Sequence, residues 1–145
     1  MAFRFPLATV LRYRESVEKR EELALQKVQL EIAVALRLVE ELSEQIARAS
    51  EACESKLRRT INANEMQVML CEVNTAAAAK QSLMRKIQIL EQTRAEQLRR
   101  YHAAYNGRQM LSDMHSKQQI EYEQEQSRSQ QKSLDDIFGT RSQRK

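Results

Sequence analysis

The sequence contains very little of the two residues that shape most loops. Its 145 residues include two Gly and one Pro, whereas average usage would supply about ten Gly and about seven Pro. Tight turns and phosphate-binding loops depend on those residues, so the chain has little room for the loops of a compact enzyme. Residues that favour helices, such as Ala, Glu, Leu and Gln, are abundant. The composition therefore predicts an all-α protein of long helices.

Long apolar runs and cysteine pairs are also missing. No stretch approaches the roughly 18 apolar residues that cross a bilayer, and the opening MAFRFPLATVLRYRES lacks the uninterrupted apolar core of a signal peptide. Cys53 and Cys71 are too few for a disulfide framework and lack the spacing of a zinc site. We therefore expect reduced thiols in a cytoplasmic protein.

The spacings that mark catalytic and metal sites are absent as well. His102 and His115 lie too far apart to form the i, i+4 imidazole pair of a helical metal site. The sequence has no phosphate-binding loop, nucleophile elbow or Gly-rich dinucleotide turn. Its many carboxylates are those expected on solvated helix faces. The sequence predicts no catalytic residue, no cofactor and no metal, and hence a protein that is not an enzyme.

Apolar residues recur at coiled-coil spacing through the first half of the chain. They form an a/d seam over four heptads, which consists of Leu25, Val28, Ile32, Ala35, Val39, Leu42, Ile46, Ala49 and Cys53. The segment RRTINANE at 58–65 then interrupts the pattern with Asn62 and Asn64, which favour turns and caps. We expect a first helix over about 6–58, a turn over 59–64 and a second helix over about 65–138.

The two helices are expected to fold back on each other. A turn centred near Asn62 sets residues whose numbers sum to about 125 opposite each other, such as Leu42 with Leu83. The prediction is a single domain over 1–145, a long antiparallel two-helix coiled-coil hairpin with a projecting C-terminal helical extension. Asn106-Gly107 is a place for a kink, and Gly139 predicts a helix stop followed by a flexible tail over 139–145.

The net charge of +4 is unevenly distributed along the chain. Residues 1–20 are net basic by +3 and residues 81–110, which include Arg108, by +4. Glu residues are mixed into both stretches, and no recognition motif accompanies them. The pattern is typical of solvated helix faces or of binding to an acidic protein surface. No nucleic-acid partner is expected.

The two ends of the chain carry its most distinctive segments, FRFPLATVLRYRES at the start and YEQEQSRSQQKSLDDIFGTR near the end. Both segments resemble those of the FliJ family of flagellar export proteins, with Asp136 where Glu is usual. The resemblance implies a stalk of the flagellar type III export apparatus, similar to the gamma subunit of rotary ATPases. The implied partners are the hexameric flagellar export ATPase, the cytoplasmic domain of the export gate protein and export chaperones. The implied place is the cytoplasmic side of the inner membrane at the flagellar basal body, with membrane association only through partners.

The resemblance also implies where the two main partners bind. The end that faces the ATPase is expected to carry aromatic, basic and apolar residues, namely Phe3, Phe5, Arg12, Arg14, Tyr122, Leu134, Ile137 and Phe138. For Phe3 and Phe5 the alternative is packing against the second helix. The export-gate contact is expected at residues spaced four, three and four apart, namely Met69, Val73, Ala76 and Lys80. The equivalent set on the first helix, Leu42, Ile46, Ala49 and Cys53, coincides with the seam.

Three other functions remain open from the sequence. The equivalent stalk of a virulence secretion system has the same architecture. A generic coiled-coil scaffold that self-associates through its seam would share the heptads. Non-specific nucleic-acid binding through the basic stretches would depend steeply on salt.

Overall fold

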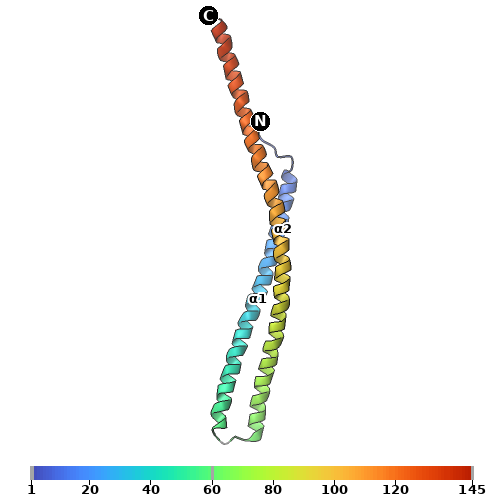
Figure 1. The fold of residues 1–145 in the computed structure, drawn as a ribbon, viewed down its shortest axis with the longest axis vertical. Coiled ribbons are helices and arrows are strands. Elements are labelled where there is room, and N and C mark those ends of the chain that lie inside the picture. The colour runs from blue at the N-terminus through green and yellow to red at the C-terminus, as the bar shows by residue number, and fades with distance from the viewer. Residues whose placement is uncertain (1, 60, 145) are drawn as a thin grey trace. The chain divides into compact units, whose positions relative to one another are not determined.

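A computed structural model describes residues 2–59 and 61–144 of the chain, which form two long helices (Figure 1). Helix α1 spans Ala8–Leu57 and helix α2 spans Ala63–Gln143, with 50 and 81 residues. The two helices pack against each other, and the described part of the chain contains no strand, which confirms an all-α helical hairpin. Contacts group the chain into a turn unit, Glu22–Arg100, and a terminal unit, Met1–Glu21 with Tyr101–Lys145.

The core of the turn unit is the predicted seam. All nine seam residues of α1 are buried or half-buried, and Leu25, Ile32 and Ala35 are at most 9% exposed. On α2 the half-buried positions also recur at heptad spacing. They are Met69, Val73, Ala76, Lys80, Leu83, Ile87 and Leu90. Side chains spaced three and four residues apart on both helices, all apolar except Lys80, therefore hold this unit together.

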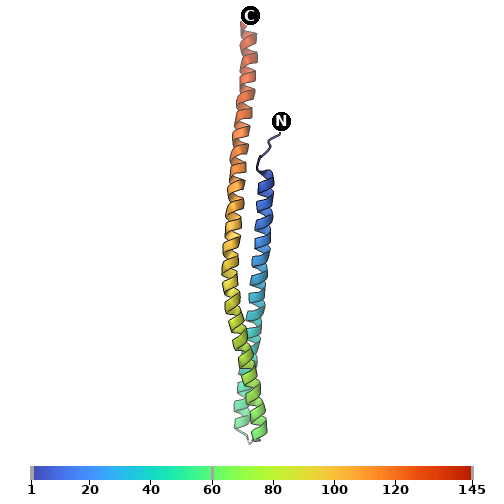
Figure 2. The same cartoon turned by 90° about the vertical axis from the view of Figure 1, so that its right-hand side faces the viewer.

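A short turn reverses the chain between the two helices (Figures 1 and 2). The Arg59 amide donates a hydrogen bond to the Lys56 carbonyl (3.0 Å), and the Met66 amide donates to the Asn62 carbonyl (3.3 Å). Asn62 thus stands at the N-cap position that Asn favours. Helix α2 begins at Ala63, slightly before the predicted start. Thr60, which falls in the predicted turn, lies outside the described residues.

The terminal unit combines the start of α1 with the second half of α2. Residues 2–7, called here the N-terminal strap, precede α1 without helical structure. The buried and half-buried positions of α2 continue at coiled-coil spacing through Tyr101, Ala104, Arg108, Leu111, His115, Gln118 and Tyr122. From residue 123 to residue 144 every position is exposed. The predicted projecting extension is this last part of α2.

Both glycines lie inside α2, which runs without interruption through Asn106-Gly107 and on to Gln143. The predicted stop at Gly139 and tail over 139–145 are therefore wrong for the described residues, and Lys145 lies outside them. A C-terminal capping glycine adopts a positive φ, and neither glycine does so. A helical glycine costs only about 1 kcal/mol relative to Ala, which is too little to end the helix.

Candidate functional site

Aromatic side chains of the strap pack on α2 in the terminal unit. The ring of Phe5, which is 8% exposed, meets the imidazole of His115 edge-on at a centroid distance of 4.9 Å. The Phe3 ring lies 5.6 Å from His115 and 5.5 Å from Tyr122. Three of the predicted ATPase-facing residues, Phe3, Phe5 and Tyr122, are thus brought together. The alternative interpretation, in which the two phenylalanines pack against the second helix, matches this geometry.

An ion pair joins α1 to α2 within the same unit. The Nε of Arg108 donates to Glu18 Oε2 at 2.6 Å and its Nη2 donates to Oε1 at 3.3 Å. The two side chains are only 23% and 17% exposed. The hydrogen bond to the Glu18 carboxylate raises the pKa of Arg108 above its ordinary value. Arg108 also lies over the Tyr105 ring, 5.1 Å from its centroid, so this basic residue is engaged inside the unit.

The remaining ATPase-facing candidates lie apart from the aromatic cluster. Arg12 and Arg14 are exposed on α1, and the side chain of Arg14 passes beside Gly107, where its Nη1 lies 3.4 Å from the position of an added Cβ. The apolar cluster of the extension, Leu134, Ile137 and Phe138, is 52–64% exposed. It begins about 18 Å along the helix axis beyond Tyr122, at 1.5 Å per residue. The predicted set is therefore divided among the aromatic cluster of the strap and Tyr122, the two arginines on α1 and the apolar cluster of the extension.

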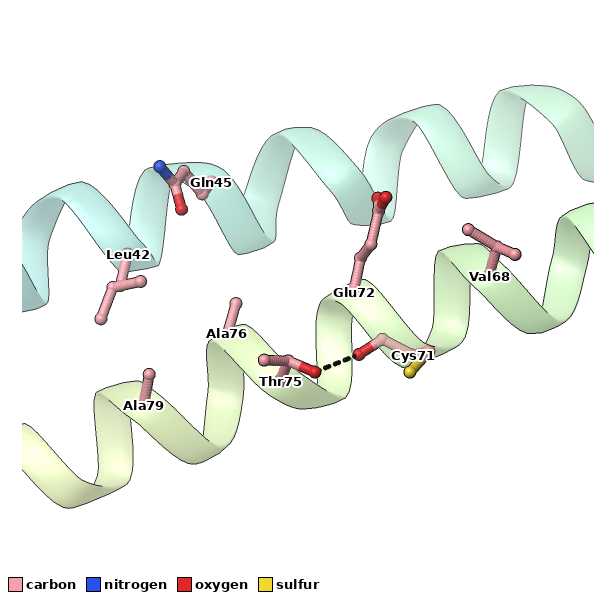
Figure 3. Close-up of a pocket in the computed structure, with 8 residues that line it drawn as sticks. All are labelled: Leu42, Gln45, Val68, Cys71, Glu72, Thr75, Ala76 and Ala79. Atoms are coloured by element: carbon pink, nitrogen blue, oxygen red, sulfur yellow. Dashed lines mark hydrogen bonds between the residues drawn. The ribbon is translucent and has the colours of Figure 1, made fainter.

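An open groove of about 510 Å³ runs along the turn unit (Figure 3). Its wall from α1 consists of Leu42 and Gln45. Residues of α2 form the rest, namely Val68, Cys71, Glu72, Thr75, Ala76 and Ala79. The groove exists because the alanines at this level are too short to fill the space beside the seam. In Figure 3 the side chain of Glu72 extends from α2 toward α1, and the Thr75 hydroxyl donates to the Cys71 carbonyl (2.8 Å).

The four predicted export-gate residues occupy the inner face of α2. Met69, Val73, Ala76 and Lys80 are all half-buried at seam positions. Ala76 also lines the groove, and Val73 lines a neighbouring hollow together with residues of α1. The sequence did not predict the groove residues that lie outside the seam, such as Ala79. The reason is that the predicted export-gate residues, spaced four, three and four apart, follow the seam itself. The signal that could have found them is the run of four alanines at 76–79.

The two cysteines are free thiols, with Cys53 half-buried in the seam and Cys71 exposed beside the groove. Among residues 2–59 and 61–144, no group of three or more His, Cys, Asp or Glu side chains is arranged to hold a metal ion. Over the same residues, neither helix carries an apolar stretch long enough to span a membrane.

A comparison with family models finds a match that covers nearly the whole chain. The model described as Flagellar FliJ protein matches residues 3–145. Neither the curated proteins nor the solved structures include a significant match. The matched range contains residues 3–7 of the strap, both helices and the extension.

Proposed function

The chain belongs to the FliJ family, a non-catalytic component of the flagellar export apparatus, and from this premise we propose that it is a stalk that links the hexameric export ATPase to the export gate. The extension of α2 would dock in the ATPase, and the turn unit would contact the cytoplasmic domain of the gate protein. Two long helices with few loops suit a linker because they resist compression along their axes.

The single observation that carries the ATPase assignment is the exposed apolar cluster on the extension. Leu134, Ile137 and Phe138 lie at i, i+3 and i+4 on the otherwise polar extension, with 52–64% of each exposed. A hollow beside Leu134 is lined by Ser129, Gln130 and Ser133. Apolar residues at this spacing are the usual anchors of a helix that docks in a groove of a partner. Every residue of α2 from 123 to 144 is exposed, so this segment is free to enter such a groove.

Binding of the extension is tested by removing its anchors. We expect the triple variant Leu134→Ala, Ile137→Ala, Phe138→Ala to bind the purified flagellar export ATPase about tenfold or more weakly, because buried apolar anchors dominate such interfaces. The matched control is Ile89→Ala, which removes a similarly exposed apolar residue (64%) of α2 from the turn unit and is expected to leave binding unchanged. Co-sedimentation over a range of ATPase concentrations measures both. Equal binding by the triple variant would contradict the assignment.

For the export gate we propose the groove of the turn unit rather than the inner seam face. Met69, Val73 and Lys80 face α1, and a partner could contact them fully only by separating the helices. The groove offers Leu42, Val68 and Ala79 on an open surface. Small residues such as Ala79 leave room for partner side chains, and apolar concave surfaces are where binding sites concentrate.

The alanine run provides a matched pair of variants for this assignment. Ala79→Phe places a large ring in the groove, whereas Ala78→Phe places the same ring on a position that does not line it. Both positions are exposed on α2. We expect Ala79→Phe to weaken binding of the gate protein's cytoplasmic domain about tenfold and Ala78→Phe to leave it unchanged, as measured by titration calorimetry. Identical effects of the two variants would contradict the groove assignment.

A further inference from the structure

The strap is the last cover on the inner face of α2 before the extension. Half-buried α2 positions recur through Leu111, His115, Gln118 and Tyr122, and every later position is exposed. Helix α1 begins only at Ala8, and strap rings contact His115 and Tyr122. The strap therefore shields the part of α2 that directly precedes the proposed docking segment.

The strap is held in a way that allows it to leave without unfolding either helix. Its residues 2–5 have no regular structure. Where the strap meets α1, the Ala8 amide donates a hydrogen bond to the Phe5 carbonyl (3.2 Å). Two of its rings contact α2, and of these Phe5 is 8% exposed and Phe3 half-buried. Short segments with few buried contacts open at the lowest free-energy cost in a protein.

We propose that the strap is an autoinhibitory cover, which the ATPase must displace as it takes up the extension. The inference rests on the proposed docking of the extension and adds a regulatory step to it. A partner that encloses the extension and advances along α2 reaches Tyr122 first, where Phe3 lies on the tyrosine ring at 5.5 Å. Displacement frees the aromatic face around His115 for the partner, so the strap and the partner compete for the same surface.

Competition has a direct consequence for affinity. When only a fraction of a protein is in the binding-competent state, its apparent affinity falls by that fraction. A strap closed about 90% of the time would weaken ATPase binding about tenfold. The double variant Phe3→Ala, Phe5→Ala is therefore expected to bind the ATPase about tenfold more tightly than the unchanged chain. The control Tyr13→Ala, an aromatic residue 65% exposed on α1, is expected to bind unchanged.

The double variant distinguishes a strap that covers the binding surface from a strap that contacts the ATPase directly. If Phe3 and Phe5 themselves touched the ATPase, their removal would weaken binding. Weaker or equal binding by the double variant therefore overturns the proposal. Circular dichroism of the double variant verifies that α1 and α2, which lie outside residues 3–5, keep their helicity.

Fluorine NMR observes the strap and the extension in one experiment. The chain has three phenylalanines, two in the strap and Phe138 in the extension, so fluorophenylalanine labelling gives three signals, assigned with single Phe→Leu variants. A His115→Ala, Tyr122→Ala variant supplies the signal positions of a released strap. On addition of unlabelled hexameric flagellar export ATPase, we expect all three signals to move, and those of Phe3 and Phe5 to approach the released positions.

The three signals report displacement of the strap and docking of the extension separately. A shift of the Phe138 signal with unchanged Phe3 and Phe5 signals would overturn the cover while leaving the docking of the extension intact. No shift of any signal at saturating ATPase would overturn both the docking and the cover.

Discussion

Gly107 shows how one residue can resemble a helix breaker and still lie inside a helix. It sits in α2 with an ordinary helical φ, and its missing Cβ leaves space that the Arg14 side chain occupies at 3.4–3.8 Å. We expect Gly107→Ala to raise the free energy of unfolding by about 0.5–1 kcal/mol, because Ala has the higher helix propensity and Arg14 can shift slightly. Urea unfolding followed by circular dichroism measures the change.

Gly139 provides the control for that substitution. A Cβ at Gly139 meets nothing within 4 Å, and the residues around it are exposed. Gly139→Ala should therefore increase the helical signal of the extension and leave the unfolding midpoint of the paired helices unchanged. A lower stability of Gly107→Ala would contradict the account, since it would mean that Arg14 requires the space.

The ion pair between Glu18 and Arg108 is the second residue-scale feature with a measurable consequence. We expect Glu18→Gln to lower stability more than Glu44→Gln, which breaks an exposed i, i+4 pair with Arg48 worth about 0.5 kcal/mol or less. The reason is that Glu18 and Arg108 are largely shielded, so that loss of one partner leaves the other charge in poor contact with water. Equal effects in urea unfolding would contradict this.

The stabilisation that this ion pair provides is expected to be lost only at strongly basic pH. Folding raises the pKa of Arg108 through the hydrogen bond to Glu18, so the stabilisation is complete below the ordinary arginine pKa and is lost only as pH rises through the folded value. The difference in unfolding free energy between the unchanged chain and Arg108→Gln should therefore stay constant from pH 7 to pH 9. A difference that shrinks as pH rises over this range would contradict the assignment.

At the scale of the helix, the seam dominates stability. Ile32 is 5% exposed in the seam of the turn unit, whereas its near neighbour Leu30 is 66% exposed. We expect Ile32→Ala to lower the free energy of unfolding by about 2–4 kcal/mol, since it removes buried methyl groups and leaves a cavity. Leu30→Ala should change it by about 0.5 kcal/mol or less. Denaturant unfolding compares the two, and similar losses would contradict the seam.

The helical elements could be predicted from the sequence because their signal is periodic. Residues such as Leu25, Ile32 and Val39 repeat every seven positions, and the structure buries or half-buries each of them. The end of α2 could not be predicted, because Gly139 is compatible both with a cap and with a helix interior. The choice between them depends on φ, which the residue type does not determine.

The site was predicted less completely because its contacts join residues far apart in the sequence. Phe5 and His115 are separated by 110 positions, yet their rings meet at 4.9 Å. The register implied by Asn62 places Leu11 opposite Met114, and following it to the N-terminus could have paired the strap with α2. The groove was missed for another reason, since it results from side chains that are too small to fill space rather than from a motif.

At the scale of the whole molecule, the seam residues of both helices are buried or half-buried within one chain. We therefore expect sedimentation equilibrium to give a mass near that of a single chain, 16.9 kDa. A self-associating scaffold, the main rival, would give a multiple of that mass. A mass that rises with concentration would favour the rival.

We propose that this chain acts on the flagellar export ATPase through the end of α2. The most direct test adds the purified chain to the hexameric export ATPase of its own organism and measures ATP hydrolysis, with a variant lacking residues 131–145 in parallel. The account predicts that the full chain stimulates hydrolysis and that the shortened chain, which lacks Leu134, Ile137 and Phe138, does not. Absence of stimulation together with absence of co-sedimentation, or equal stimulation by both chains, would contradict it.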